Sequence, residues 1–147
     1  NNIVQMYATI DADELKVRTG MLYKKGKRGL VFGRANWKPR FFVLTSKALR
    51  YYASATGSLK GVVDLTACGP HDIQAMPQDC PKTGTSSASI WRIAIQTPTR
   101  RFFLAAQTSH DMDAWVHDLV EVATHGLGCR VEEVEHDITV RRRHAMR

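Results

Sequence analysis

Hydrophobic and polar residues alternate along several short segments of the chain, and turn-forming residues separate these segments. Alternation with a period of two is typical of a β-strand that buries one face. Aromatic and β-branched residues, which favour strands, are frequent in the same segments. The pattern predicts about seven short strands, at residues 19–25, 36–45, 49–53, 61–67, 71–76, 90–96 and 100–106. Short antiparallel strands joined by turns are typical of a barrel or a sandwich.

The period of the pattern changes after these strands. Thr108 and Asp111 form a helix-capping arrangement, and Gly126 can end a helix. Between them, apolar residues recur at helical spacing. They are Met112, Trp115, Val116, Leu119, Val120 and Ala123. An amphipathic helix needs a surface on which to bury its apolar stripe. We therefore predict a mostly β fold, a seven-stranded antiparallel barrel or sandwich capped by one C-terminal helix.

The length of 147 residues is consistent with one domain and flanking segments. We expect an N-terminal extension over 1–17 with a weak helical pattern, a domain over 18–125, and a helical or disordered C-terminal extension over 126–147. Apolar runs are far shorter than the ~20 residues of a membrane span, and the first residues do not resemble a secretory signal. Three irregularly spaced cysteines favour a reduced, cytoplasmic protein.

Charge is divided unevenly along the chain. Residues 16–62 contain twelve Lys or Arg and no Asp or Glu, whereas the remainder holds nine basic and fourteen acidic residues. The formal charge of +7 is thus +12 in this stretch and −5 elsewhere. Such a field attracts polyanions, which include nucleic acid, an acidic partner and an anionic membrane. The alternative is a solvated basic face balanced by an acidic one.

The most basic part of this stretch is also a glycine-rich loop, residues 26–35, and it contains three consecutive apolar residues. The triplet is Leu30, Val31 and Phe32. An exposed apolar triplet on a loop is unusual unless it has a binding role. Two interpretations stay open, in which the triplet either inserts into a membrane or folds back onto the core.

Four motifs in a fixed order resemble the pleckstrin homology (PH) family over roughly residues 18 to 125. They are G-M-L-Y-K (20–24), W-K-P-R-F-F-V-L (37–44), L-R-Y-Y (49–52) and R-F-F-L-A-A (101–106), and Trp115 follows them. The resemblance implies seven strands closed by one helix. It also implies a non-catalytic module that binds phosphoinositide headgroups or another anionic lipid, such as phosphatidic acid, peripherally at a membrane.

Strand alternation places the key cations without reference to the family. Lys38 and Arg40 share a face with Phe42, and Lys24 shares a face with Leu22. This face of the first two strands is therefore apolar at one end and basic at the end beside loop 26–35, so the cations lie at the mouth of the barrel. Cations at such a mouth are costly to bury unless an anion neutralises them, and phosphate suits the arginine fork. The resemblance implies five headgroup contacts, Lys24, Lys38, Arg40, Tyr51 and Lys60.

The loop 26–35 and its neighbour Lys25 would then rim the pocket at the membrane. Lys25, Lys27, Arg28 and Arg34 would meet anionic lipid, while Leu30, Val31 and Phe32 would insert. Each basic residue near the surface contributes about 1 kcal/mol, and each fully buried apolar side chain up to about 1.5–3 kcal/mol. Neither the basic residues nor the apolar triplet alone would hold the domain at a membrane, but together they can.

Other functions have weaker support in the sequence. The six histidines lack metal-ligand spacing, and no Gly-x-Ser-x-Gly frame surrounds a serine. We therefore expect no metal, no cofactor and no enzymatic activity. A protein-interaction module of the same fold is the main alternative, with a protein partner in place of a lipid. Nucleic-acid binding is disfavoured because the aromatic residues lie in strands rather than exposed among the cations.

Overall fold

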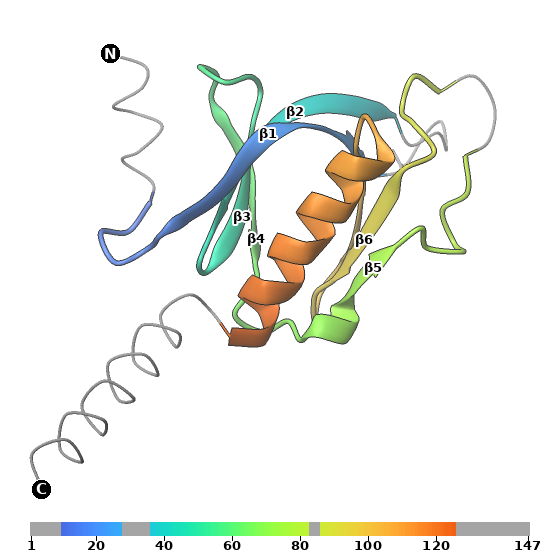
Figure 1. Cartoon of the computed structure of the whole chain (residues 1–147). Helices are drawn as coiled ribbons and strands as arrows, with labels where there is room; N and C mark the ends of the chain where they lie inside the picture. Colours follow the sequence, from blue (N-terminus) through green and yellow to red (C-terminus); the bar gives the residue numbers. More distant parts are fainter. Residues whose placement is uncertain (1–9, 28–35, 83–85, 126–147) are drawn as a thin grey trace, which may run out of the picture.

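The computed structural model describes residues 10–27, 36–82 and 86–125. Within these ranges the chain forms seven antiparallel strands and one long helix (Figure 1), which confirms the predicted fold class. The strands are β1 (Lys16–Lys25), β2 (Trp37–Thr45), β3 (Ala48–Tyr52), β4 (Leu59–Asp64), β5 (Ile73–Ala75), β6 (Arg92–Gln96) and β7 (Arg101–Ala105). A short 3-10 turn, η1 (Pro70–Asp72), precedes β5, and the helix covers residues 109–125.

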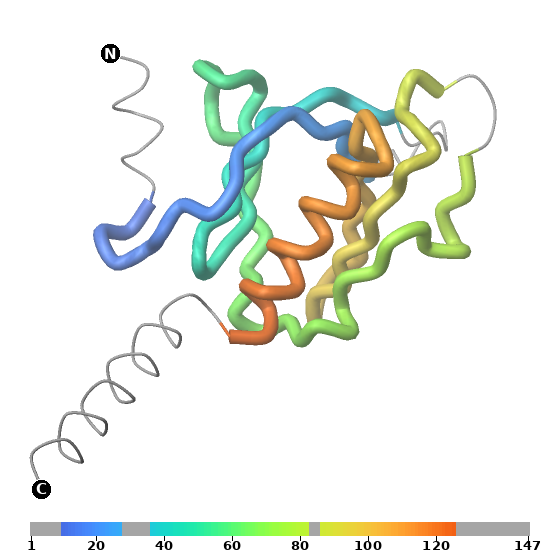
Figure 2. The backbone as a smooth tube through the Cα atoms, viewed as in Figure 1, coloured from blue at the N-terminus to red at the C-terminus, as the bar shows by residue number. Residues whose placement is uncertain are grey.

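One sheet contains all seven strands, in the order β4-β3-β2-β1-β7-β6-β5. Strand β1 pairs with β2 from Lys16 to Lys25, but it pairs with β7 only at Tyr23 and Lys24. The sheet therefore has two parts, β1–β4 and β5–β7, that meet at the end of β1. Figures 1 and 2 show the helix lying across the sheet, with β1–β4 to one side and β5 and β6 to the other.

The helix closes the core with its apolar stripe. The Asp111 amide donates to Thr108 Oγ1 (3.1 Å), so the predicted cap is present. Trp115 and Leu119 are buried in one cluster with strand residues such as Phe42. The guanidinium of Arg18 on β1 donates to the Asp118 carboxylate (2.6 Å), which ties the helix to the sheet. Buried positions on the helix are Met112, Trp115, Leu119 and Val122, with Val116, Val120 and Ala123 half-buried beside them.

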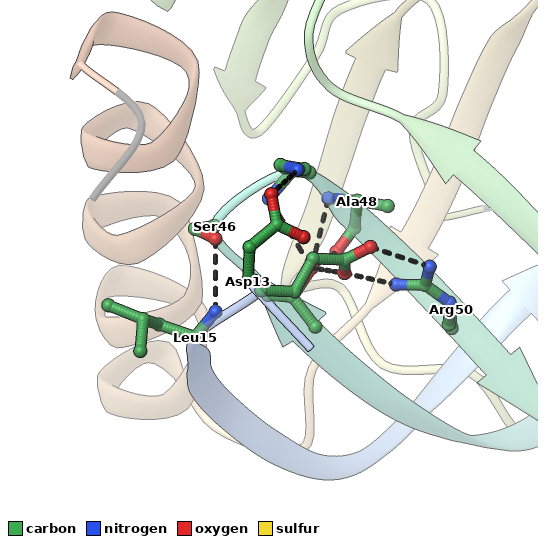
Figure 3. A network of polar contacts seen from close by, with 8 residues as sticks. Asp13, Leu15, Ser46, Ala48 and Arg50 are labelled. Atoms are coloured by element: carbon green, nitrogen blue, oxygen red, sulfur yellow. Dashed lines mark hydrogen bonds and ion pairs between the residues drawn. The ribbon is translucent and has the colours of Figure 1, made fainter. Parts of the chain in front are cut away.

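An acidic segment just before β1 is fixed to the hairpin of β2 and β3 (Figure 3). Glu14 accepts two hydrogen bonds from the Arg50 guanidinium, at 2.7 and 3.0 Å, and both side chains are buried. Asp13 pairs with Lys47 on the turn between the two strands. Backbone contacts add to this, because the Ser46 amide donates to the Leu15 carbonyl (2.8 Å). Acids from outside the basic stretch therefore neutralise two of its cations.

Several element boundaries differ from the sequence-based expectation. Strand β1 begins at Lys16, three residues before the expected start at residue 19, because segment 13–15 already holds it against β2 and β3. Strand β4 begins two residues earlier than expected, directly after a turn closed by the Ala53 amide and the Ser58 carbonyl (3.0 Å). Most of the N-terminal extension (1–9), the C-terminal extension (126–147) and loop residues 28–35 lie outside the described residues.

Candidate functional site

A hollow of 470 Å³ opens between the ends of β1, β2, β3 and β4. Strand pairing places the lining residues together. Lys24 is paired with Lys38 and Leu22 with Arg40, so the side chains of Lys24, Lys38 and Arg40 lie on one face of the sheet. Tyr51 on β3 is paired with Phe42 on β2, so its side chain lies on the same face of the sheet as Phe42, Arg40 and Lys38. The lining residues are Lys24, Gly26, Lys27, Asn36, Lys38, Arg40, Tyr51 and Lys60. The five residues expected to contact a headgroup thus lie around one pocket, which we call the basic pocket.

The basic pocket contains five cationic side chains and no carboxylate. None of these cations forms an ion pair with another described residue, although three other cations of the same basic stretch do. Those three are Arg18, Lys47 and Arg50, which pair with Asp118, Asp13 and Glu14 respectively. The available acids are therefore used away from the pocket. Unbalanced positive charge is concentrated at the pocket, where it favours a multivalent anion.

The Lys24 ammonium lies near two aromatic rings. It lies 4.9 Å from the centre of the Tyr51 ring and 5.8 Å from that of Phe102. It also donates a long hydrogen bond to the Lys25 carbonyl (3.4 Å). Burial lowers the pKa of Lys24 most, and the charges of Arg100, Arg40 and Lys27 add to this effect in that order; together they lower it from 10.5 to about 8. A half-buried ammonium surrounded by cations is a site that an anion would stabilise.

Tyr51 reaches its position only because residue 61 has no side chain. The two residues are paired between β3 and β4, and a Cβ on Gly61 would lie 2.2 Å from the Tyr51 hydroxyl. The Tyr51 ring therefore lies against the backbone of β4 and packs on Phe42, with ring centres 5.6 Å apart. A glycine at this position is thus required for the aromatic wall of the basic pocket.

The remaining predicted site residues fall into two groups. Lys27 lines the basic pocket, whereas Lys25 lies 5.3 Å over the Phe103 ring, on the other face of β1 from Lys24. Arg28, Arg34, Leu30, Val31 and Phe32 lie outside the described residues, so their role at a membrane stays a prediction. Sequence reasoning missed Gly26, Asn36, Gly61 and Arg100, because their places near the pocket depend on strand pairing and turn geometry.

The chemistry of the basic pocket suits binding of an anion. Its lining offers ammonium, guanidinium, amide and phenol groups, all of which can donate hydrogen bonds to phosphate oxygens. Over the described ranges, no group of three or more His, Cys, Asp or Glu side chains is arranged to hold a metal ion. In the same ranges, no helix has the length and apolar character needed to cross a membrane.

The fold and the pocket agree with the family assignment. The PH domain family matches residues 16–124, and the chain therefore belongs to the PH domain family. PH domains commonly bind lipids or proteins and are typically non-catalytic modules.

Individual relatives share this fold at low sequence identity. The Drosophila melanogaster protein daughter of sevenless is 31% identical over 96 residues, which cover 60% of this chain but only 10% of that protein. The C-terminal PH domain of human pleckstrin is 22% identical with a TM-score of 0.60, covering 78% of this chain and 93% of that one. The same pleckstrin domain in complex with D-myo-Ins(1,2,3,5,6)P5 gives a TM-score of 0.55 at 22% identity, covering 74% and 96%.

Proposed function

We propose that this PH domain is a membrane-targeting module that binds phosphoinositide headgroups in the basic pocket. The observation that carries the proposal is the half-buried Lys24 ammonium, which has cations around it and no carboxylate partner among the described residues. A buried charge without a counter-charge is costly. A phosphorylated headgroup removes this cost because it brings several negative charges into reach of Lys24, Lys38 and Arg40 at once.

Comparison with pleckstrin supports the proposed ligand class. One solved structure of its C-terminal PH domain holds an inositol pentakisphosphate, D-myo-Ins(1,2,3,5,6)P5. A phosphorylated inositol ring is also the headgroup of a phosphoinositide, and it presents monoester phosphates that match the arginine fork. In this chain the headgroup contacts would be Lys24, Lys38, Arg40, Tyr51 and Lys60, all of which line the pocket.

The membrane role adds the loop between β1 and β2 to the headgroup site. Lys25, Lys27, Arg28 and Arg34 would contact anionic lipid, each contributing about 1 kcal/mol near the surface. Residues 30–32, Leu-Val-Phe, would enter the interfacial region and contribute up to about 1.5–3 kcal/mol for each fully buried side chain. Specific headgroup binding and non-specific insertion would together hold the domain at a cytoplasmic membrane surface.

Vesicle binding at physiological salt tests the headgroup site. Vesicles containing a phosphoinositide are compared with phosphatidylserine vesicles and phosphatidic acid vesicles of the same total charge. Wild type is expected to prefer the phosphoinositide, and Lys38→Ala/Arg40→Ala is expected to lose that preference. The matched control, Lys47→Ala/Lys82→Ala, removes two positive charges outside the pocket and should retain the preference. Equal binding to all vesicles, or none, would exclude a specific headgroup site and favour a protein partner.

Insertion of the loop is tested separately with Phe32→Asp. This change should weaken vesicle binding while leaving affinity for a soluble inositol phosphate unchanged, because the loop tip contacts the bilayer rather than the headgroup. Phe32→Leu, which keeps the apolar character, is the control. If Phe32→Asp binds vesicles as well as wild type does, the apolar triplet does not insert.

A further inference from the structure

The side-chain amine of Lys24 has an environment opposite to that of Lys47. Lys24 is half-buried in the basic pocket, where its nitrogen lies 4.9 Å from the centre of the Tyr51 ring. Lys47 lies on the turn between β2 and β3, and its hydrogen bond to Asp13 raises its pKa. The pKa of Lys24 is instead lowered. The fold therefore favours the charged form of one lysine and the neutral form of the other.

Desolvation and neighbouring cations both favour the neutral amine of Lys24. Burial lowers its pKa most, and the charges of Arg100, Arg40 and Lys27 add to this effect. Arg100 reaches the pocket from the β6–β7 turn, because its guanidinium lies 4.3 Å from the centre of the Phe102 ring that Lys24 also approaches, at 5.8 Å. Aromatic rings favour the ammonium form. Burial and like charge outweigh this effect, since the resulting pKa is about 8.

A neutral lysine amine is a nucleophile towards carbonyl carbons. Proteins activate such a lysine by desolvating it or by placing it next to another cation, and the basic pocket provides both. With a pKa of about 8, about a fifth of the Lys24 amines are neutral at pH 7.4, against about 0.1% for an ordinary lysine. A lower pKa makes each neutral amine somewhat less nucleophilic. The gain in the neutral fraction, about 200-fold, is larger than this loss.

The basic pocket also has groups that could hold a phosphate beside this amine. Lys38 is paired with Lys24 across β1 and β2, and Arg40 lies on the same face of β2. Neither cation forms an ion pair with a described carboxylate. A monoester phosphate suits this pair of donors. The hollow of 470 Å³ is within the range of about 300–1,000 Å³ that is typical of small-molecule sites.

We propose that Lys24 is a covalent modification site, at which the side-chain amine forms a reversible imine with a small aldehyde that carries a phosphate monoester. The phosphate would bind to Lys38 and Arg40, which brings the carbonyl carbon within reach of Lys24 Nζ. The N–C bond forms, both bonds from that carbon to the carbonyl oxygen break, and the two amine protons leave with the oxygen as water. No oxidant, reductant or further reactant is required. This activity goes beyond the proposed function, because it involves no lipid.

Charge in the pocket favours the imine. A neutral imine at Lys24 has one positive charge less than the ammonium, and the bound phosphate adds about −1.5 to −2. Both changes reduce the repulsion among the pocket cations. The adduct would also fill the space that an inositol phosphate needs. The aldehyde and the inositol phosphate should therefore exclude each other.

Reductive labelling with D-glyceraldehyde 3-phosphate tests the modification site. The domain is incubated at pH 7.4 with a limiting amount of this compound and with cyanoborohydride, which converts the imine to a stable amine, and peptide mass analysis then locates the label. The label on Lys24 should exceed that on Lys25 or Lys47 at least tenfold. D-glyceraldehyde, which has the same aldehyde and no phosphate, should label Lys24 about tenfold less, because it lacks the charge-assisted contacts.

Two variants separate the phosphate contacts from the amine. In Lys38→Ala/Arg40→Ala the advantage of the phosphate should disappear, so that both compounds label Lys24 to the same low extent. The matched control is Lys25→Met, because Lys25 is adjacent on β1 but lies over the Phe103 ring on the other face. This change should leave the labelling of Lys24 within about twofold of wild type. Thermal melting verifies that each variant is folded.

Several results would overturn the proposal. They are a label spread evenly over the lysines, equal labelling of wild-type Lys24 by the two compounds, and labelling that bound inositol trisphosphate does not reduce. The same inositol trisphosphate separates this proposal from the proposed function. If it binds wild type and Lys24 is not labelled, the modification site alone is rejected. If Lys24 is labelled with the expected phosphate dependence but inositol trisphosphate does not bind, headgroup binding alone is rejected.

Discussion

The charge state of Lys24 leads to a quantitative prediction for ligand affinity as a function of pH. The pKa of Lys24 is about 8 when no ligand is bound. The ammonium is therefore about 90% charged at pH 7 and about 10% charged at pH 9. A bound phosphate favours the charged form and returns the pKa toward the ordinary lysine value of about 10.4. Binding at pH 9 must then include uptake of a proton, which lowers the apparent affinity about tenfold relative to pH 7.

Calorimetry with a soluble inositol trisphosphate at pH 7, 8 and 9 measures this effect. The ligand itself changes little over this range, because the second pKa of a monoester phosphate is about 6. Repeating the titration in buffers with different ionisation enthalpies should show uptake of about half a proton at pH 8. Lys24→Met should bind weakly and with little pH dependence. If wild-type affinity is constant from pH 7 to 9, or Lys24→Met keeps the full pH dependence, the reasoning about Lys24 is refuted.

Three stability and binding measurements test other parts of the structure. Lys24→Met should melt at a higher temperature than wild type at pH 7, because the folded state disfavours the lysine charge. In wild type, the loss of stability caused by this charge should decline as the pH rises from about 8, the folded-state pKa, to 10.5, the ordinary pKa. Glu14→Gln should lower the free energy of unfolding by about 3 kcal/mol, since it leaves Arg50 buried without a counter-charge. Glu14→Leu with Arg50→Met should regain most of this loss. Arg50 also lowers the pKa of the Glu14 carboxyl. The contribution of this ion pair to the free energy of unfolding should therefore be present above about pH 4.5 and be lost as the pH falls through the lowered pKa. Thermal melts of wild type and Glu14→Gln at acidic pH would show this. Gly61→Ala should weaken headgroup affinity several-fold with little change in melting temperature, because the new methyl group displaces the Tyr51 ring. In a Tyr51→Ala background, the same change at Gly61 should have no further effect on affinity.

The fold could be predicted because its signals are local. Alternation marked each strand, and the spacing of Met112, Trp115 and Leu119 marked the helix. The face shared by Lys38, Arg40 and Phe42 also followed from a period of two, so those cations could be assigned to one pocket wall. Strand ends were less predictable, because hydrogen bonds of turns and of the preceding segment determine them.

Ion pairs between residues far apart in the chain could not be predicted from the local sequence pattern. The basic stretch of residues 16–62 contains no acid, and its self-repulsion indicated an external anion for the whole stretch. In the structure Glu14 neutralises Arg50, and Asp118 neutralises Arg18 across the fold. Among the described residues, five cations of the stretch that form no ion pair therefore lie together in the basic pocket. Arg100 was missed for the same reason, because only the pairing of β7 with β1 brings it near Lys24.

The most direct test of the central claim is a titration followed by amide chemical shifts. A uniformly ¹⁵N-labelled domain is titrated with a soluble inositol trisphosphate at physiological salt. If the basic pocket is the headgroup site, the shifts that change most should belong to Gly26, Asn36, Lys38 and Gly61, while the helix over 109–125 stays unchanged. Changes confined to the helix, to the outer face of β7 or to no residue at all would contradict headgroup binding in this pocket.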